Sequence, residues 1–138
     1  MKTEKQLAIE ELLAQIEFYD LDLIQERLIM EAIWSDEWDM IKQYDGCTGV
    51  SEFHINKYVF DCFVHDFHWQ SGRGGKVSDE IFYNLMIARG FPKFKAKKRY
   101  YGVRLAWNLI YKWKHKKKNN VRPLTLGMKN WLKNNKNY

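Results

Sequence analysis

Apolar residues recur at helical spacing in several separate stretches of the chain. Residues 3–18 predict one helix, and residues 21–42 continue the same periodicity. Ser35 and Asp36 interrupt the second stretch and are predicted to divide it into two helices, because both residue types favour helix N-caps. The apolar stripe expected on the first helix consists of Leu7, Ile9, Leu12, Leu13 and Ile16.

Two helices are predicted on either side of a glycine-rich connection. The first spans about 57–69 and carries Phe60, Phe63, Val64 and Phe67 on one side. The connection over 70–76 is long enough for the next helix to run back antiparallel. That helix is predicted to begin with Ser78 as its N-cap and to end at Arg89, because Gly90 suits a helix terminus. Its predicted inward stripe contains Phe82, Tyr83, Met86 and Asp79.

A long basic helix is predicted over 93–117, because Pro92 suits its first turn. We expect its apolar face to pack inward and its basic face to point outward; the apolar face is Phe94, Tyr101, Leu105, Leu109 and Trp113. Residues 118–138 are predicted as a tail with one short amphipathic turn around Leu126–Leu132. No hairpin pattern or internal repeat is seen.

The expected architecture is therefore a small all-α domain with two antiparallel core helices that carry a His-Asp motif. Its parts are N-terminal helices (1–43), a core (44–90), a basic helix (91–117) and a tail (118–138). A chain of 138 residues with 46% apolar residues has enough material for one hydrophobic core.

The charge is divided unevenly along the chain. All 17 acidic residues lie in residues 1–80, whereas residues 81–138 hold 16 of the 23 Lys and Arg residues. Such a basic half favours an anionic partner, such as phospholipid headgroups or nucleic acid, or else the acidic helices of the same chain. No apolar run approaches 18 residues, so we expect no transmembrane segment, and the N-terminus lacks the pattern of a signal peptide. We therefore expect a protein of the cytoplasm or of a virion.

The residue types in the middle of the chain suggest a catalytic site. His65 becomes a general base if a carboxylate from the returning helix, Asp79, orients its ring. Asp66 points about 100° away from His65 on the same helix and is free for a cation. Calcium prefers carboxylate and carbonyl oxygens, which Asp66 and the loop over 44–49 would supply. A structural interpretation is also open, since Asp79 also suits a helix N-terminus and Asp-Gly is a common turn.

This region resembles the bacterial and viral phospholipase A2 family over residues 44–90. The similar motifs are Asp45-Gly46-Cys47, then Cys62, His65, Asp66 and Trp69 on one helix, then Asp79, Phe82 and Met86. The resemblance implies that His65 is the general base and Asp79 its orienting partner. It implies calcium held by Asp66 and by the loop of Asp45, Gly46 and Cys47, and a disulfide between Cys47 and Cys62. From spacing alone the two cysteines are either bridged or free thiols. Trp69 replaces the tyrosine usual in the family and cannot offer a phenol to the catalytic Asp.

The chain also resembles an uncharacterised family of small phage proteins, usually encoded among tail or lysis genes. The shared segments are the Asp-Gly loop, the His-Asp helix, residues 78–82, Met86, Gly90-Phe91-Pro92 and residues 101–104. This resemblance runs to about residue 107. It implies a phage-encoded protein whose partners are other virion proteins or a phospholipid surface.

The expected function is a calcium-dependent, phospholipase A2-like lipid ester hydrolase. The alternative is a non-enzymatic virion, tail or accessory protein with the same fold. A metal-dependent phosphohydrolase using His54, His65 and Asp66 is disfavoured, because no Asp follows Asp79. Nucleic-acid binding by the Lys/Arg and Tyr/Trp of residues 93–117 is a further alternative.

Overall fold

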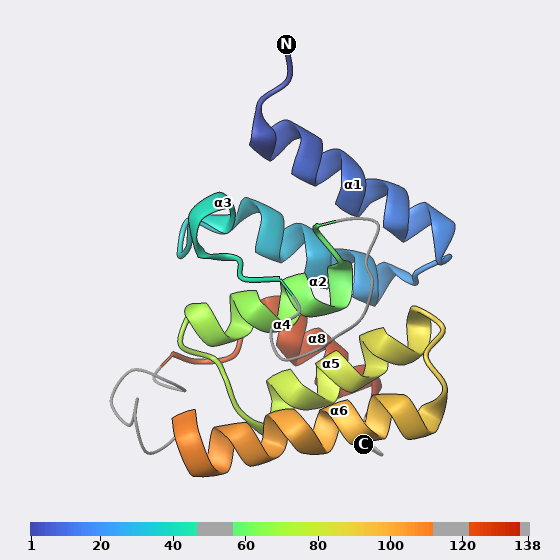
Figure 1. Ribbon diagram of the computed structural model, residues 1–138, viewed down its shortest axis with the longest axis vertical. Helices are drawn as coiled ribbons and strands as arrows, with labels where there is room; N and C mark the ends of the chain where they lie inside the picture. The colour runs from blue at the N-terminus through green and yellow to red at the C-terminus, as the bar shows by residue number, and fades with distance from the viewer. Residues whose placement is uncertain (47–56, 112–121, 136–138) are drawn as a thin grey trace.

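The part of the chain that the structure describes folds mainly into helices (Figure 1). The computed structural model describes residues 1–46, 57–111 and 122–135. In chain order the elements are α1 (Glu4–Phe18), α2 (Leu23–Trp34), α3 (Met40–Gln43), α4 (Phe60–Gln70), α5 (Lys76–Ala88), α6 (Lys93–Ala106), the π-helix η1 (Trp107–Tyr111) and α8 (Leu126–Asn134). The described ranges contain no strand, which confirms the all-α prediction. None of the helices described is long and apolar enough to cross a membrane.

Side-chain caps determine where several helices begin. Thr3 and Asp22 form capping boxes at the starts of α1 and α2, each with a glutamine three residues later. α2 ends at Trp34 and α3 begins at Met40, so the predicted split is present. The N-cap of α3 is Asp39, which accepts hydrogen bonds from two backbone N–H groups, and not Ser35 or Asp36. Each cap satisfies donors that the first helical turn leaves without an intrahelical acceptor.

The centre of the fold is the pair formed by α4 and α5. Asp61 near the start of α4 contacts Arg89 at the end of α5, whereas His65, further along α4, contacts Asp79 near the start of α5. The two helices therefore run in opposite directions. α5 also packs against α6, and both α2 and α5 pack against α8. α6 lies along the edge of the molecule opposite α1 (Figure 1).

The core is aromatic on α4 and mixed aliphatic on α5. The four apolar residues predicted on α4 are all buried, as are Ile81, Leu85 and Met86 of α5. Trp131 and Met128 of α8 are also fully buried, so the segment predicted as a tail contains a helix of the core. Its large apolar residues, Leu126, Met128, Trp131 and Leu132, stand among lysines and asparagines that are typical of a polar tail, so the sequence predicted only one amphipathic turn there.

Two predicted helix features differ from the structure. α5 begins at Lys76 with Gly75 as its N-cap, so Ser78 lies inside the helix and is fully buried. On α1 the buried residues are Ala8, Leu12 and Gln15, while Leu7 and Leu13 are 49% and 42% exposed. The polar Gln15 turns inward because its amide donates to the carbonyl of Tyr58 and accepts from Phe60 N.

The predicted inward face of the basic helix is wrong for four of its five residues, and the fifth, Trp113, lies outside the described residues. The small residue Ala96 is buried against the protein and Val103 is partly buried, while Phe94, Tyr101 and Leu105 are 70%, 66% and 59% exposed. A close approach between α6 and α5 favours small side chains at the contact, and this places the larger apolar residues on the opposite side. Beyond Ala106 the helix widens into η1, so the spacing of an α-helix no longer applies there.

Gly74 lies where the α4–α5 connection meets two tryptophans. A Cβ at this position would lie 3.0 Å from atoms of both the Trp69 and Trp107 rings. We expect Gly74→Ala to lower the free energy of unfolding by about 1–3 kcal/mol, because rigid rings cannot retract without disturbing their own packing. Chemical denaturation measures this loss.

The matched control is Gly102→Ala on the outer side of α6. A Cβ there would meet nothing within 4 Å. This substitution should leave stability unchanged or raise it by about 0.5–1 kcal/mol, as alanine is the better helix former. Equal effects of the two substitutions would contradict the close packing at Gly74.

Candidate functional site

His65 on α4 contacts three side chains. Its Nε2 lies 2.7 Å from Oδ1 of Asp79. The imidazole stacks on the Phe82 ring at 4.5 Å between centroids, and the Trp69 ring lies 5.0 Å away. The side chain retains 13% of its exposure. These contacts leave the ring few alternative orientations.

Asp79 is completely buried and has partners from two other helices. One carboxylate oxygen faces His65, and the other accepts a hydrogen bond from Nη1 of Arg104 on α6 at 3.1 Å. Asp79 also lies in the first turn of α5, where backbone N–H groups favour negative charge. A buried carboxylate needs such compensation, because desolvation of an unpaired charge is costly.

This arrangement determines the role of each imidazole nitrogen. A carboxylate paired with a guanidinium is ionised and only accepts hydrogen bonds. Nε2 of His65 is therefore the donor to Asp79, and the lone pair lies on Nδ1. A neutral imidazole oriented in this way accepts a proton at Nδ1.

Asp66 lies beside the segment that precedes the predicted calcium loop. Its Oδ2 accepts a hydrogen bond from the backbone N–H of Asp45 at 3.1 Å. Burial raises the pKa of Asp66 to about 6; the hydrogen bond from Asp45 N lowers the pKa, and the negative charge of Asp45 raises it. The structure thus brings Asp45 and Asp66 together. Ionisation of the buried Asp66 carboxyl costs free energy, and a bound cation would reduce that free-energy cost.

The described residues can supply only some of the oxygen ligands that a calcium ion needs. In the described ranges no three His, Cys, Asp or Glu side chains form a group able to hold a metal. Calcium takes six to eight oxygens and accepts backbone carbonyls and water among them. Two neighbouring carboxylates, Asp45 and Asp66, one of them desolvated, are consistent with that chemistry. Gly46 follows with φ of +79°, a backbone conformation that favours glycine.

Several predicted site residues lie outside the described ranges. Cys47, the rest of the loop to residue 49, and His54 are among them. Cys62 is buried on α4 and is disulfide-bonded, so its sulfur is not a thiol.

A second buried ion pair lies on the same two helices. Nε of Arg89 donates to Oδ2 of Asp61 at 2.8 Å, and Asp61 has no solvent exposure. Asp61 lies in the first turn of α4 and Arg89 at the C-terminal end of α5, so each charge also matches its helix dipole. Removing one partner of such a pair typically costs about 3–5 kcal/mol. The pair fixes the far ends of α4 and α5 relative to one another.

The sequence did not single out Arg104 or the burial of His68. Arg104 is one of many basic residues in its segment, and only the packing of α6 on α5 directs it to Asp79. His68 is fully buried, and neither ring nitrogen has a hydrogen-bond partner in the described structure. Burial lowers its pKa to about 3, with the neighbouring charge of His65 as a lesser cause, so His68 is a neutral core residue.

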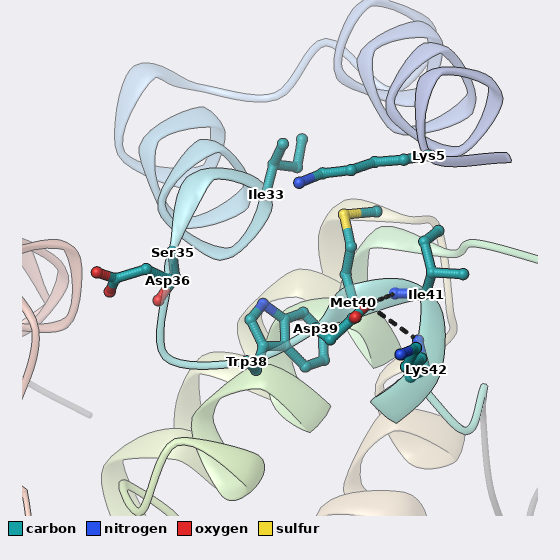
Figure 2. A pocket seen from close by; sticks show the side chains of 9 residues that line it. All are labelled: Lys5, Ile33, Ser35, Asp36, Trp38, Asp39, Met40, Ile41 and Lys42. Atoms are coloured by element: carbon teal, nitrogen blue, oxygen red, sulfur yellow. Dashed lines mark hydrogen bonds between the residues drawn. The ribbon is translucent and has the colours of Figure 1, made fainter. Parts of the chain in front are cut away.

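Two pockets lie away from His65. One of about 460 Å³ is lined by Lys5 of α1 and by residues of the α2–α3 turn and α3 (Figure 2). There Asp39 accepts hydrogen bonds from the backbone of Ile41 and Lys42, so its carboxylate serves the helix cap. A second pocket of about 390 Å³ is lined by residues such as Glu31, Trp34 and Arg73. Neither His65 nor Asp79 is a lining residue of either pocket.

Comparison of the chain with protein-family models, characterised proteins and solved structures finds no significant match.

The raised pKa of Asp66 gives a testable pH dependence. Between about pH 4 and 6 the carboxyl ionises in the unfolded chain but stays protonated in the folded protein, so its contribution to stability falls as pH rises. Asp66→Asn removes this term and keeps an acceptor for Asp45 N. Without added calcium, its stability relative to the unsubstituted protein should rise by about 1–3 kcal/mol from pH 4 to pH 7.

The measurement is urea denaturation of both proteins at each pH. Asp36→Asn is the matched control, because Asp36 is exposed. Its stability difference from the unsubstituted protein should not change over this range. A pH-independent difference for Asp66→Asn would show that the carboxyl titrates normally.

Proposed function

We propose that the chain is a phospholipase A2-like carboxylic ester hydrolase with His65 as its general base. The supporting observation is the 2.7 Å contact between Nε2 of His65 and the fully buried Asp79, whose other oxygen is held by Arg104. A buried carboxylate that orients an imidazole is the arrangement by which histidine activates a hydroxyl or water. The substrate we propose is a phospholipid ester.

Each residue then has a defined role. Nδ1 of His65 removes a proton from water as the water oxygen attacks the ester carbonyl carbon. The imidazolium that forms is stabilised through Nε2 by Asp79. The imidazolium then returns the proton to the departing alkoxide oxygen as the C–O bond breaks. The products are a fatty acid and a lysophospholipid, and His65 is neutral again.

Arg104 acts as a positioning residue in this proposal. It holds Oδ2 of Asp79, so that Oδ1 stays directed at the imidazole. In the phospholipase A2 family a tyrosine phenol is expected near this carboxylate, and here Trp69 takes that place in the sequence. The guanidinium from α6 supplies the missing donor from a different helix.

Calcium is the proposed cofactor, with Asp66 and the loop of Asp45, Gly46 and Cys47 as its ligands. A bound calcium ion supplies Lewis-acid polarisation of the ester carbonyl. Asp66 is suited to hold a cation because its carboxylate is desolvated and already orders the backbone at Asp45.

One observation favours the alternative, a non-enzymatic phage virion, tail or accessory protein. His65 is only 13% exposed, and both of the pockets described above lie elsewhere on the surface. On this alternative His65, Asp79 and Arg104 only join three helices, and the protein acts in the host cytoplasm or the virion through other virion proteins.

The two proposals differ in what substitution of the site does to hydrolysis. With calcium present, His65→Gln should reduce phospholipid hydrolysis by about 10²–10⁴-fold, because glutamine cannot accept the proton from water. Asp79→Asn should reduce kcat by a smaller factor than the roughly 10⁴ known for the matching change in serine proteases. Release of fatty acid from defined vesicles measures both.

Arg104→Gln tests the positioning role within the same assay. It should lower kcat with little change in KM, while Arg27→Gln, a matched change at an exposed arginine of α2, should leave both constants unchanged. No hydrolysis of any phospholipid by the unsubstituted protein, or full activity in His65→Gln, would remove the enzymatic proposal.

Calcium binding is tested without reference to activity. Millimolar calcium should raise the melting temperature, because a ligand that binds only the folded protein stabilises it. At a calcium concentration a hundredfold above Kd, the free energy of unfolding should rise by about 2.7 kcal/mol. Asp66→Asn should abolish this rise, whereas Asp36→Asn should retain it. Identical melting temperatures in calcium and in chelator would exclude the proposed metal site.

A further inference from the structure

The outer side of α6 carries a row of large apolar side chains that the fold leaves in contact with solvent. Phe94, Tyr101, Leu105 and Leu109 are 70%, 66%, 59% and 65% exposed. Phe94, Tyr101 and Leu105 follow one another at intervals of seven and four residues, which places them along one side of α6. Leu109 is exposed in η1, directly after α6. We call these four residues the α6 stripe. The buried side of the same helix, at Ala96 and Trp107, lies almost opposite.

The α6 stripe is surrounded by positive charge. Lys93, Lys95, Lys97 and Lys98 are all exposed. No acidic residue occurs anywhere in residues 81–138. A partner of this surface must therefore accept apolar side chains and carry negative charge.

The position of α6 gives the molecule an electrical polarity. α6 lies at one edge, and α1, which contains four glutamates and one lysine, lies at the opposite edge (Figure 1). A planar anionic surface would attract the α6 edge and repel the α1 edge, so that the protein approaches in one orientation. A partner that is flat, negatively charged and apolar beneath its charged layer fits this surface best.

We propose that the α6 stripe and its lysines form a docking surface for an anionic lipid bilayer. The aromatic and leucine side chains enter the boundary between headgroups and acyl chains, and the lysine stems extend so that their ammonium groups contact lipid phosphates. Each lysine near an anionic surface raises the partition coefficient roughly fivefold. This inference holds whether or not His65 is catalytic.

Two other partners fit the surface less well. A two-fold contact between copies through α6 would place the lysines of one copy against those of the other, which is unfavourable. Nucleic acid would satisfy the lysines, but Leu105 and Leu109 would gain nothing from phosphates or sugars. A contact between the α6 edge of one copy and the α1 edge of another is compatible in charge, and the experiment below separates it from lipid binding.

The test is co-sedimentation of the full chain with vesicles of phosphatidylcholine, alone or with 30% phosphatidylglycerol. Binding should be at least tenfold tighter to the anionic vesicles and should weaken as salt increases. Phe94→Ser/Leu105→Ser should reduce the partition coefficient at least tenfold. Leu7→Ser/Leu13→Ser is the matched control, because it removes two exposed leucines from the acidic edge, and it should leave binding unchanged. Circular dichroism and thermal melting verify that both variants fold.

Charge is tested separately with Lys97→Gln/Lys98→Gln, which should weaken anionic binding by about 25-fold at low salt, from the fivefold effect of each lysine. Lys5→Gln/Lys42→Gln should have no such effect. His65→Gln should bind vesicles normally, which separates docking from catalysis.

Three results would overturn the proposal. The first is equal binding to neutral and anionic vesicles, or equal vesicle binding by Phe94→Ser/Leu105→Ser and Leu7→Ser/Leu13→Ser. The second is a clear preference for duplex DNA over anionic vesicles at the same salt. The third is concentration-dependent self-association that Phe94→Ser/Leu105→Ser abolishes without any vesicle binding, since the surface would then serve copies of this chain.

Discussion

The burial of Asp79 is the constraint on which the arrangement of α4, α5 and α6 depends. A carboxylate with no solvent exposure is stable as an anion only if the protein replaces the hydrogen bonds of water. Asp79 receives one from His65 on α4, one from Arg104 on α6, and a favourable field from the start of its own helix. Displacement of either neighbouring helix would leave part of the charge uncompensated. The same contacts that tie the three helices together also orient the imidazole, so the stability of this core and the geometry of the site have one cause.

The sequence allowed much of the core to be predicted. Helical periodicity located α1, α2, α4 and α5, and the aromatic side of α4 is buried as expected. The pairing of His65 with Asp79 was expected on family resemblance and on helix geometry, and the two side chains are in contact in the structure. Such features are local or depend on two neighbouring helices, so a short stretch of sequence contains the information.

What could not be predicted depends on which side of a helix faces the protein. α6 has large apolar residues on one side and Ala96, Val103 and Trp107 on the other, and hydrophobicity alone favours burying the first set. The side that packs is chosen by the shape of α5, the ion pair of Arg104 and the contact of Trp107 with Trp69. None of these is visible from the spacing within α6. The core role of α8 was missed because Met128 and Trp131 lie in a short segment rich in lysine and asparagine, a composition that is typical of a polar tail.

α6 therefore connects two surfaces that the sequence alone would not relate. Its inward side delivers Arg104 to Asp79, one contact away from His65, while its outward side carries the apolar stripe and the lysines. A helix pressed against a lipid surface on one side is held more firmly in place, and here its other side holds the carboxylate that orients the imidazole. The same helix determines the position of both surfaces, which is a physical reason for the proposed ester-hydrolysing site and the proposed lipid-binding surface to occur together.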